Sequence, residues 1–423
     1  MRTRRASMAL FLGAVGVIAL VTLVPANGVP AARMPRAWCL VCGPSWLADA
    51  VANVALFLPL GAAVSVGRMR ARTALLMGAA LSLTVELVQW SGIVGARSPA
   101  VADLVTNSLG AVAGWGLSQR ARATRWRSAA VARRLANGWG AVVLLVLAGT
   151  SLAVQPAAPW PPATETVTRP SGFSYSPAFG YFGGEITRVS INDQRLPHPG
   201  YGPLVREVAV LGDTLRLELQ LRRLEPALTR RSIVFLHAAG DSTPTFMLAQ
   251  HGSRVEVRRR IRAEAAGFTP LMLVHETGSW RPDEPVRIAA ASSSRELAVT
   301  VQRHNRVSTS VWALTPLVGW ALWQSVVAPG SIDARLVQGC WTIALFLPVG
   351  WLVAGARMTP AARGVIATLA WPTALTLALL GLPAATGIHP VRLTDWLLVI
   401  GAFGVGALLR RDTARLWSSG RAG

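Results

Sequence analysis

The chain has 423 residues, of which 52% are hydrophobic and only 15% are charged, and its mean hydropathy is positive. This composition is typical of several membrane-spanning segments together with one soluble domain. The formal net charge of +22 comes from 42 arginines spread over many segments, which argues against the concentrated basic patch of a nucleic-acid-binding domain.

The first part of the chain consists of apolar runs separated by short polar loops. The run from Met8 to Val24 follows "RTRR" and predicts a first membrane helix, although the small residues after it also fit a signal peptide. Further apolar runs cover 47–67, 73–95, 99–117 and 138–155. We predict a helical membrane domain over 1–120, followed by a basic loop and a fifth membrane helix over 121–155.

The arginines between these runs predict the orientation. Residues 67–73 contain three arginines and residues 118–138 contain six, with no acidic residue in either loop. The positive-inside rule places both loops in the cytoplasm. The loops 25–46 and 91–98 are then outside, and the chain leaves the fifth helix on the outside.

Cysteine usage adds little chemistry. Three cysteines are too few for a disulfide scaffold. Cys39 and Cys42 form a CxxC pair without the additional ligands of a zinc site or the βαβ context of a thioredoxin-like site. The pair predicts either a local disulfide or two free thiols, and no metal or other cofactor is expected.

Residues 156–308 have the pattern of short strands. In "TLRLELQL", residues 214–221, every second residue is leucine, which is the period of a half-buried strand. Similar runs cover 185–191, 254–257, 286–289 and 296–301, with Gly, Pro, Asn and Asp between them. This pattern predicts an all-β sandwich inserted between the membrane helices, on the extracytoplasmic side.

One block of this region, "SIVFLHAAGDSTPTFMLAQHGSRVEVRRRI" at 232–261, resembles the strand succession of concanavalin-like and laminin-G-like jelly rolls. The resemblance implies a fold that often binds glycans and in some proteins hydrolyses them. The Glu-x-Asp-x-x-Glu strand typical of those hydrolases is not found. We therefore interpret Glu218 and Glu256 as ordinary outward-facing strand residues, and the domain as a binding module or structural cap.

The last region, 309–423, is predicted to be a degenerate repeat of the first helical domain. "LFLPVG" at 345–350 repeats "LFLPLG" at 56–61, and Asp395 follows the second motif much as Asp103 follows the first. Most polar positions have changed, because the alignment pairs Asp49 with Gln338, Asn53 with Thr342, Glu86 with Leu375 and Gln89 with Ala378. The second helical region is therefore interpreted as scaffold.

The number of crossings in this region is open between eight and nine. The apolar runs are 309–329, 336–356, 364–385 and 392–409. Nine crossings would leave the arginine-rich C-terminus outside, against the charge rule. The run 309–329 holds three tryptophans and Gln324, and an interfacial position for it would resolve the conflict.

Polar residues recur on one face of three predicted membrane helices. The pairs, three or four residues apart, are Asp49 and Asn53, Glu86 and Gln89, and Asp103 and Asn107. At 1.5 Å per residue, the first pair lies within about 10 Å of the outer surface, Glu86 about 14 Å below it and Gln89 about 9 Å. An unpaired carboxylate at such depth is costly, so we predict one shared site with Arg97 as its counter-charge.

The order of these residues resembles the VanZ-like family. The pattern is D-x-x-x-N-x-x-x-F-x-P-x-G, S-L-x-x-E-L-x-Q, an Arg, and D-x-x-x-N-x-x-G-x-x-x-G. It is matched by Asp49, Asn53, Phe57, Pro59, Gly61, Ser82, Glu86, Gln89, Arg97, Asp103, Asn107, Gly110 and Gly114. The resemblance implies a small helical bacterial membrane protein whose founding member is tied to teicoplanin resistance, with no established reaction. Pro59, Gly61, Gly110 and Gly114 are predicted to be structural, with the last two forming a small-xxx-small pattern.

Three functions fit these features. The first is a non-enzymatic envelope protein that binds a lipid headgroup, lipid-linked glycan, peptidoglycan precursor or glycopeptide at the outer leaflet. The second is a membrane enzyme with Glu86 or Asp103 as general base on a lipid-linked substrate, although the sequence offers no nucleophile with a base beside it. The third is a proton-coupled carrier, for which polar residues in the inner half are missing. We adopt the first, and the oligomeric state is left open.

Overall fold

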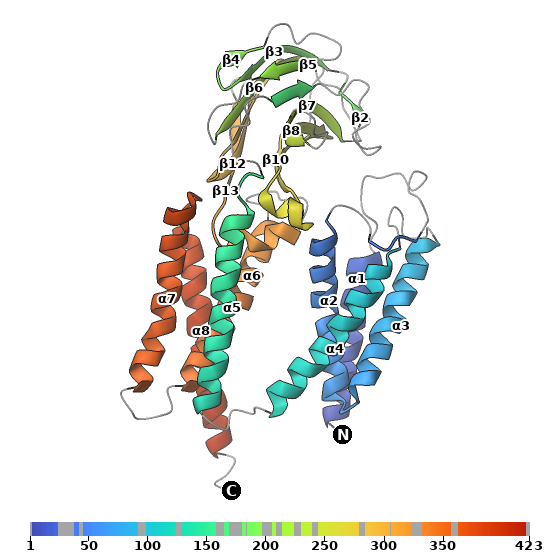
Figure 1. The fold of residues 1–423 in the computed structure, drawn as a ribbon, viewed down its shortest axis with the longest axis vertical. Helices are drawn as coiled ribbons and strands as arrows, with labels where there is room; N and C mark the ends of the chain where they lie inside the picture. Colours follow the sequence, from blue (N-terminus) through green and yellow to red (C-terminus); the bar gives the residue numbers. More distant parts are fainter. Residues whose placement is uncertain are drawn as a thin grey trace. The chain divides into compact units, whose positions relative to one another are not determined.

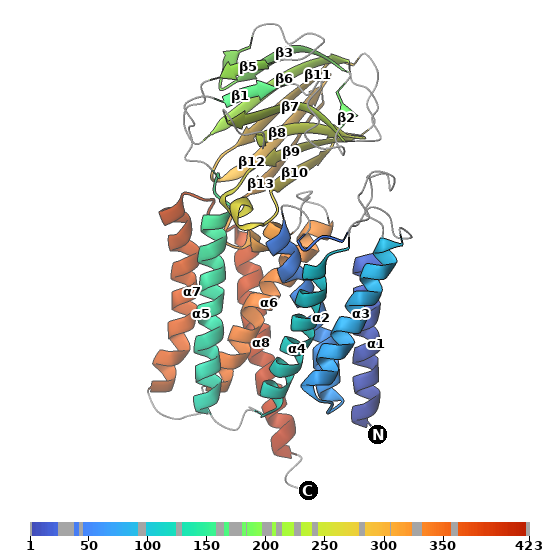
Figure 2. The ribbon, with the colours of Figure 1, turned by 45° about the vertical axis from the view of Figure 1, so that its right-hand side comes forward.

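The computed structural model divides the chain into two compact units, shown from two sides in Figures 1 and 2. The first unit comprises Met1–Arg125 with Ala266–Thr269, and the second comprises Trp126–Ala265 with Pro270–Gly423. The residues that the structure describes are 2–23, 38–41, 45–91, 99–123, 129–157, 165–168, 180–182, 184–196, 205–208, 214–223, 230–238, 244–278, 284–304, 306–323, 332–356 and 363–419.

The described part of the first unit is built of four α-helices. They are α1 (Arg2–Leu23), α2 (Trp46–Val66), α3 (Ala71–Trp90) and α4 (Val101–Ala123). Ala14 and Ile18 of α1 share a buried core with Phe57 of α2. The Ser7 hydroxyl also donates a hydrogen bond of 3.0 Å to the Ala63 carbonyl, which fixes the start of α1 against the end of α2.

Helices α2 and α4 approach so closely that their backbones touch at glycines. A Cβ atom placed on Gly61 would lie 1.8 Å from the carbonyl oxygen of Ala111, and one on Gly114 would lie 2.0 Å from that of Leu58. No side chain fits at either position unless the helices separate. Small residues of this kind are a common basis of helix association in membranes.

Four more α-helices form the helical part of the second unit. They are α5 (Ala129–Ala153), α6 (Ile332–Ala356), α7 (Arg363–Thr386) and α8 (Leu393–Ser419). A Cβ atom on Gly350 of α6 would lie 2.0 Å from the Phe403 carbonyl oxygen, and one on Gly406 of α8 would lie 2.2 Å from that of Leu347. Gly350 ends "LFLPVG" as Gly61 ends "LFLPLG", so the α6–α8 contact has the same form as the α2–α4 contact.

The two helical sets differ in their third helix. In the first unit α3 packs along α4, whereas in the second unit α7 packs mainly on α5. The core of the second set includes Val143 and Leu147 of α5 together with Phe346 of α6. The two sets therefore share one close helix pair but surround it differently.

Five of the described helices contain segments long and apolar enough to cross a membrane. These segments are Trp46–Val66, Ala71–Trp90, Ala130–Ala153, Asp333–Gly355 and Leu393–Arg410. Shorter apolar stretches occur in Ser7–Leu23 and Ala370–Thr386. The multi-pass helical class that the sequence predicts is thereby confirmed.

The inserted region forms two sheets, also as predicted. The first sheet has the order β10 (Leu271–Glu276), β9 (Arg254–Arg259), β8 (Pro244–His251), β7 (Arg231–Ala238), β1 (Glu165–Thr168) and β5 (Val205–Val208), with β2 (Gly180–Tyr181) parallel to β7. The second has the order β13 (Arg306–Ala313), β12 (Glu296–Arg303), β11 (Val286–Ser292), β6 (Leu215–Arg223), β3 (Glu185–Ile191) and β4 (Gln194–Arg195). Apart from β2, all described pairings are antiparallel.

Alternating leucines supply the core of the second sheet. Leu215, Leu217, Leu219 and Leu221 of β6 are each at most 2% exposed. The same alternation continues in β11 and β12. In the first sheet, by contrast, β8 and β10 are buried along nearly their whole length, so neither face of these strands is open to solvent.

A buried histidine joins the edge strands of the two sheets. His275 of β10 is hydrogen-bonded through Nδ1 to the Ser310 hydroxyl at 2.8 Å and through Nε2 to the Ser308 hydroxyl at 2.9 Å. Both serines belong to β13, at the edge of the other sheet. These two bonds close one side of the sandwich.

The apolar run 309–329 is not a membrane helix in its described part. Strand β13 continues to Ala313, beyond the expected boundary at residue 308, and a short 3-10 helix (Val318–Trp323) follows. The Leu314 amide donates to Arg295 of the sandwich, and the Leu314 carbonyl accepts from the His389 amide. The run is apolar because it is buried between sandwich and helices, and the described residues contain eight α-helices.

Candidate functional site

Glu86 lies on the buried face of α3, which faces α4. It continues a stripe of small residues at helical spacing, Ala74, Gly78 and Ser82, which lets the two helices approach closely. Glu86 is 1% exposed, and its Oε2 atom accepts a hydrogen bond of 2.9 Å from the backbone N–H of Ala100. The other carboxylate oxygen has no hydrogen bond to a described residue.

Asn107 faces the same region from α4. Its Nδ2 atom donates a hydrogen bond of 2.9 Å to the Ser82 hydroxyl, one helical turn before Glu86. Asn107 is 4% exposed, and its Oδ1 atom is buried without a partner among the residues described. A buried polar atom usually has a hydrogen-bond partner, so this Oδ1 atom calls for an explanation.

Asp103 adds a second carboxylate. It is half-buried in the first turn of α4, one turn before Asn107, and its charge acts on Glu86. Glu86, Asp103 and Asn107 are thus brought together by the packing of α3 on α4. The cluster is rich in hydrogen-bond acceptors.

Gln89 is placed differently from the expectation. It is 7% exposed, but its Nε2 atom donates to the backbone carbonyl of Thr22 at 3.4 Å. Thr22 belongs to the last turn of α1, so this amide links α3 to α1. The three-residue spacing to Glu86 puts Gln89 on a neighbouring face that α1 covers.

The two α2 residues have weaker links to this cluster. Asp49 is exposed in the first turn of α2, and Asn53 is half-buried with no hydrogen bond to a described residue. Helix α2 packs along α4, so the elements are adjacent. Arg97, the predicted counter-charge, lies outside the described residues.

The segment before α2 contributes a contact that the sequence analysis missed. At the start of α4, the Val101 amide donates a hydrogen bond of 3.0 Å to the Cys39 carbonyl. The Ala102 amide donates one of 3.0 Å to the Leu40 carbonyl. These bonds satisfy two of the free N–H groups that every helix start leaves. Cys39 is disulfide-bonded, one of the two states that the CxxC pair allowed. The CxxC pair could have indicated this contact from the sequence, because its loop was predicted on the same side of the membrane as the polar cluster.

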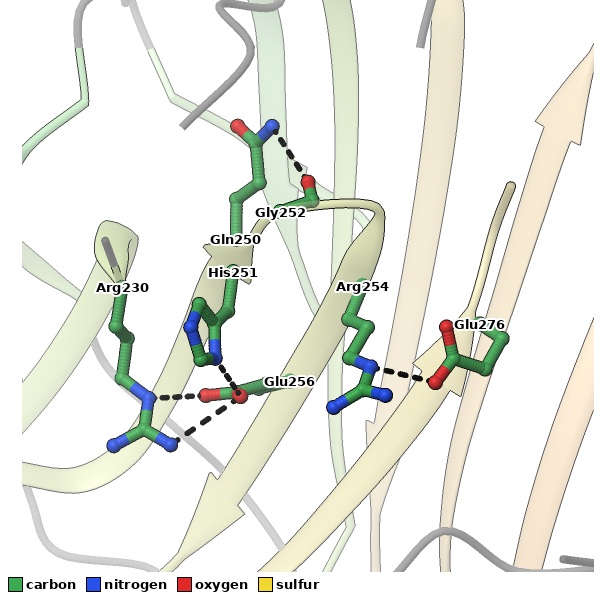
Figure 3. A network of polar contacts seen from close by, with 7 residues as sticks. All are labelled: Arg230, Gln250, His251, Gly252, Arg254, Glu256 and Glu276. Carbon is green, nitrogen blue, oxygen red and sulfur yellow. Dashed lines mark hydrogen bonds and ion pairs between the residues drawn. The ribbon is translucent and has the colours of Figure 1, made fainter. Parts of the chain in front are cut away.

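The β sandwich has a separate polar network, shown in Figure 3. Glu256 is 2% exposed; Arg230 Nε lies 2.5 Å from its Oε2 atom, and His251 Nδ1 lies 3.3 Å from its Oε1 atom. The interpretation of Glu256 as an ordinary outward-facing residue was therefore wrong, because its carboxylate is buried and lies against Arg230 and His251. Glu218 does lie on a more open face, where it pairs with Arg287.

The fold defines a multi-pass helical membrane protein with an inserted β sandwich. Residues 6–122 match the model of the VanZ/LLP1 family, so the first helical unit is VanZ-like and the predicted resemblance is confirmed for this part of the chain. The comparisons with curated proteins and with solved structures found no match. Within the described ranges, no group of three His, Cys, Asp or Glu side chains is arranged to hold a metal ion.

Proposed function

We propose that the VanZ-like unit binds a ligand with hydrogen-bond donors between α3 and α4, without catalysing a reaction. The observation that carries this proposal is the buried Oδ1 atom of Asn107, which has no partner among the described residues and lies one turn from Asp103 and opposite Glu86. Together with the second carboxylate oxygen of Glu86 and the Asp103 carboxylate, it forms a set of acceptors. Hydroxyl and ammonium groups are the matching donors.

Membrane-embedded polar side chains of this density favour a ligand that is itself anchored in the membrane. Ligands with the required donors are the sugar hydroxyls of a lipid-linked glycan or peptidoglycan precursor, the amine of a lipid headgroup, or a lipoglycopeptide. The VanZ-like match agrees with an envelope role of this kind. The β sandwich would add glycan contacts of its own.

The proposal includes the outer leaflet as the place of binding. Arg70 directly precedes the candidate span of α3, at the end opposite the polar cluster, and Arg134 lies in the first turns of the span of α5, at the end opposite the β sandwich. Both arginines are exposed. Arginines of this kind are enriched on the cytoplasmic side. On this orientation the cluster and the sandwich both face outward from the cytoplasmic membrane.

A catalytic role for Glu86 has less support. One of its oxygens is held by the Ala100 amide, which fixes the carboxylate as an acceptor of a structural hydrogen bond. A general base must reach the proton that it removes. We therefore favour binding over general-base chemistry.

The test is a binding measurement on the purified full chain in detergent. The probes are a lipid-linked disaccharide-pentapeptide, phosphatidylethanolamine and teicoplanin. Glu86→Gln and Asn107→Ala should each weaken the best probe about tenfold, because each removes one acceptor from a buried site. Asp333→Asn, an exposed helix-start acid of α6, is the matched control.

Two outcomes would overturn the proposal. One is unchanged affinity in Glu86→Gln and Asn107→Ala while both remain folded by thermal unfolding. The other is the failure of all three probes to bind the wild-type chain. Release of a chemically altered probe by the wild type, lost in Glu86→Gln, would replace binding by an enzymatic function.

A further inference from the structure

The second unit contains a cavity of about 660 Å³ at the start of α6 and α8. Its walls come from the end of β13 and the 3-10 helix that follows, and from the first turns of the two helices. Its lining includes the charged, amide and aromatic residues Trp312, Trp320, Arg335, Gln338, Arg392 and Asp395. This cavity is separate from the α3–α4 cluster, which belongs to the first unit.

The charges around the cavity leave an excess of positive charge. Arg335 is exposed and makes no ion pair with a described residue, whereas Arg392 interacts electrostatically with Asp395. One guanidinium is therefore uncompensated within the lining. Arginine is well suited to phosphate, because its planar group can donate two parallel hydrogen bonds to the oxygens.

Two tryptophans and the Gln338 amide form part of the remaining wall. The Trp320 indole N–H donates to Oε1 of Gln338, and the Nε2 atom of Gln338 is buried with no partner among the described residues. The rings of Trp312 and Trp320 pack with their centroids 6.2 Å apart. Tryptophan is enriched where membrane proteins meet lipid headgroups.

The position of the cavity along the helices points to lipid. The candidate spans Asp333–Gly355 and Leu393–Arg410 begin beside it, so its charged residues lie at the polar end of the membrane-spanning segments. On α8, Leu393 and Leu397 are 75% and 63% exposed and lie on one face, one turn apart. An apolar chain that leaves the cavity would meet this leucine face.

We propose that this cavity binds the phosphate of an anionic membrane lipid, with an acyl chain along Leu393 and Leu397 of α8. The sequence alignment of the two helical regions pairs Gln338 with Asp49, and Asp395 is the third residue of α8 as Asp103 is the third residue of α4. The two helical sets thus use corresponding helix ends for different chemistry: acceptors in the first, arginines in the second. The region interpreted as scaffold from its sequence becomes a second binding site.

The experiment uses the full chain purified in detergent. Delipidated protein is titrated with phosphatidylglycerol, phosphatidylcholine or inorganic phosphate, and bound lipid is counted by native mass spectrometry. Phosphatidylglycerol should bind at least about tenfold more tightly than phosphatidylcholine, and Arg335→Gln with Arg392→Gln should abolish that preference. Arg134→Gln changes an exposed arginine at the start of α5 and controls for general attraction of anionic lipid. This variant should keep the preference for phosphatidylglycerol.

A second variant blocks the cavity without changing charge. A Cβ atom on Gly339, which lines the cavity, meets nothing within 4 Å, so Gly339→Leu fills open space and leaves the helix intact. Gly401→Leu on α8 makes the same change at another open, exposed position outside the lining. Only Gly339→Leu should lose the binding of phosphatidylglycerol.

Three results would overturn the proposal. They are an unchanged lipid preference in the double arginine variant, unchanged binding in Gly339→Leu, and equal binding of inorganic phosphate, which would make the cavity a site for free anions. None of these variants touches α3 or α4, so the outcome is independent of the function proposed for the first unit.

Discussion

The carboxylate of Glu86 on α3 accepts the backbone N–H of Ala100, the residue immediately before α4, at 2.9 Å. This bond crosses from the interior of one helix to the start of the next. It fixes the position from which α4 projects Asp103 and Asn107. The same side chain therefore holds the candidate site together and belongs to it.

Replacing Glu86 should separate these two roles. Glu86→Gln keeps an oxygen that can accept the Ala100 N–H, so the full chain should remain close to wild-type stability. Glu86→Ala leaves a buried N–H without a partner and should cost about 1–3 kcal/mol. Thermal unfolding of both variants in the same detergent measures the difference, and equal loss in both would contradict this account.

The glycine contacts predict a matched set of stability effects. Gly114→Ala places a methyl group against the Leu58 carbonyl and should destabilise by about 1–3 kcal/mol. Gly116→Ala, two residues later, meets nothing within 4 Å and should be neutral or stabilise by up to about 1 kcal/mol. Thermal unfolding in detergent is the measurement.

The same comparison applies to the second helical set. Gly406→Ala should destabilise because its methyl group meets the Leu347 carbonyl, whereas Gly404→Ala should not, since the space beside it is open. Similar losses in Gly114→Ala and Gly406→Ala would support the equivalence of the two helix pairs. A loss at Gly116 or Gly404 as large as at its partner would contradict the close-contact explanation.

His275 predicts how the sandwich responds to acid. Burial lowers the pKa of His275 below its ordinary value of 6.5; the charge of Glu276 opposes this shift and that of Arg303 adds to it. Below pH 6.5 the unfolded chain therefore binds a proton that the folded chain does not, and stability falls as the pH drops toward the lowered folded-state pKa. Above pH 6.5 this contribution is constant.

Hydrogen exchange of β10 and β13 in the full chain tests this prediction. Protection, corrected for intrinsic exchange, should decrease over roughly pH 7 to 5 in the wild type. His275→Asn should be less protected throughout and lose most of the pH dependence. His304→Gln, at an exposed histidine 3.0 Å from Glu284, is the control and should behave like the wild type.

The proposed orientation predicts which residues a membrane-impermeant thiol reagent reaches. The exposed Cys340 is first replaced by serine. Thr187→Cys, exposed on β3, should then be labelled in intact spheroplasts, and Arg70→Cys, exposed between α2 and α3, only after lysis. The reverse pattern would place the sandwich in the cytoplasm and the α3–α4 cluster in the inner leaflet.

The sandwich should fold apart from the helices only if it keeps its last strand. A fragment from Pro162 to Asn305 ends just before β13 and lacks both serines that bind His275. A fragment extended to Thr315 retains them and should unfold at clearly higher denaturant concentration by circular dichroism. Equal midpoints would show that β13 is dispensable.

The helices and the half-buried strands could be predicted because their periods are visible in the sequence. The leucines of β6 alternate, and the membrane helices are long apolar runs. Strands β8 and β10 have no alternation because both faces are buried. For the same reason 309–329 has the composition of a membrane helix, although its described residues pack between sandwich and helices.

The candidate site could be predicted only to the level of helix faces. Spacing correctly put Glu86 on the α4-facing side of α3, and Asp103 and Asn107 on one side of α4. It could not show that α1 covers Gln89, because the position of a third helix depends on packing and not on the period of α3. The Ala100 amide was also invisible, since a backbone partner has no sequence signature.

The place of β13 has a consequence for the order of events during synthesis. Among the described strands it pairs with β12 alone, and it is the last of them to leave the ribosome, shortly before α6. Until it emerges, β12 presents an open edge on which another chain can pair wrongly. Completion of the sandwich therefore coincides with the delivery of α6 to the membrane, and a delay between Ala313 and Ile332 would prolong the aggregation-prone stage.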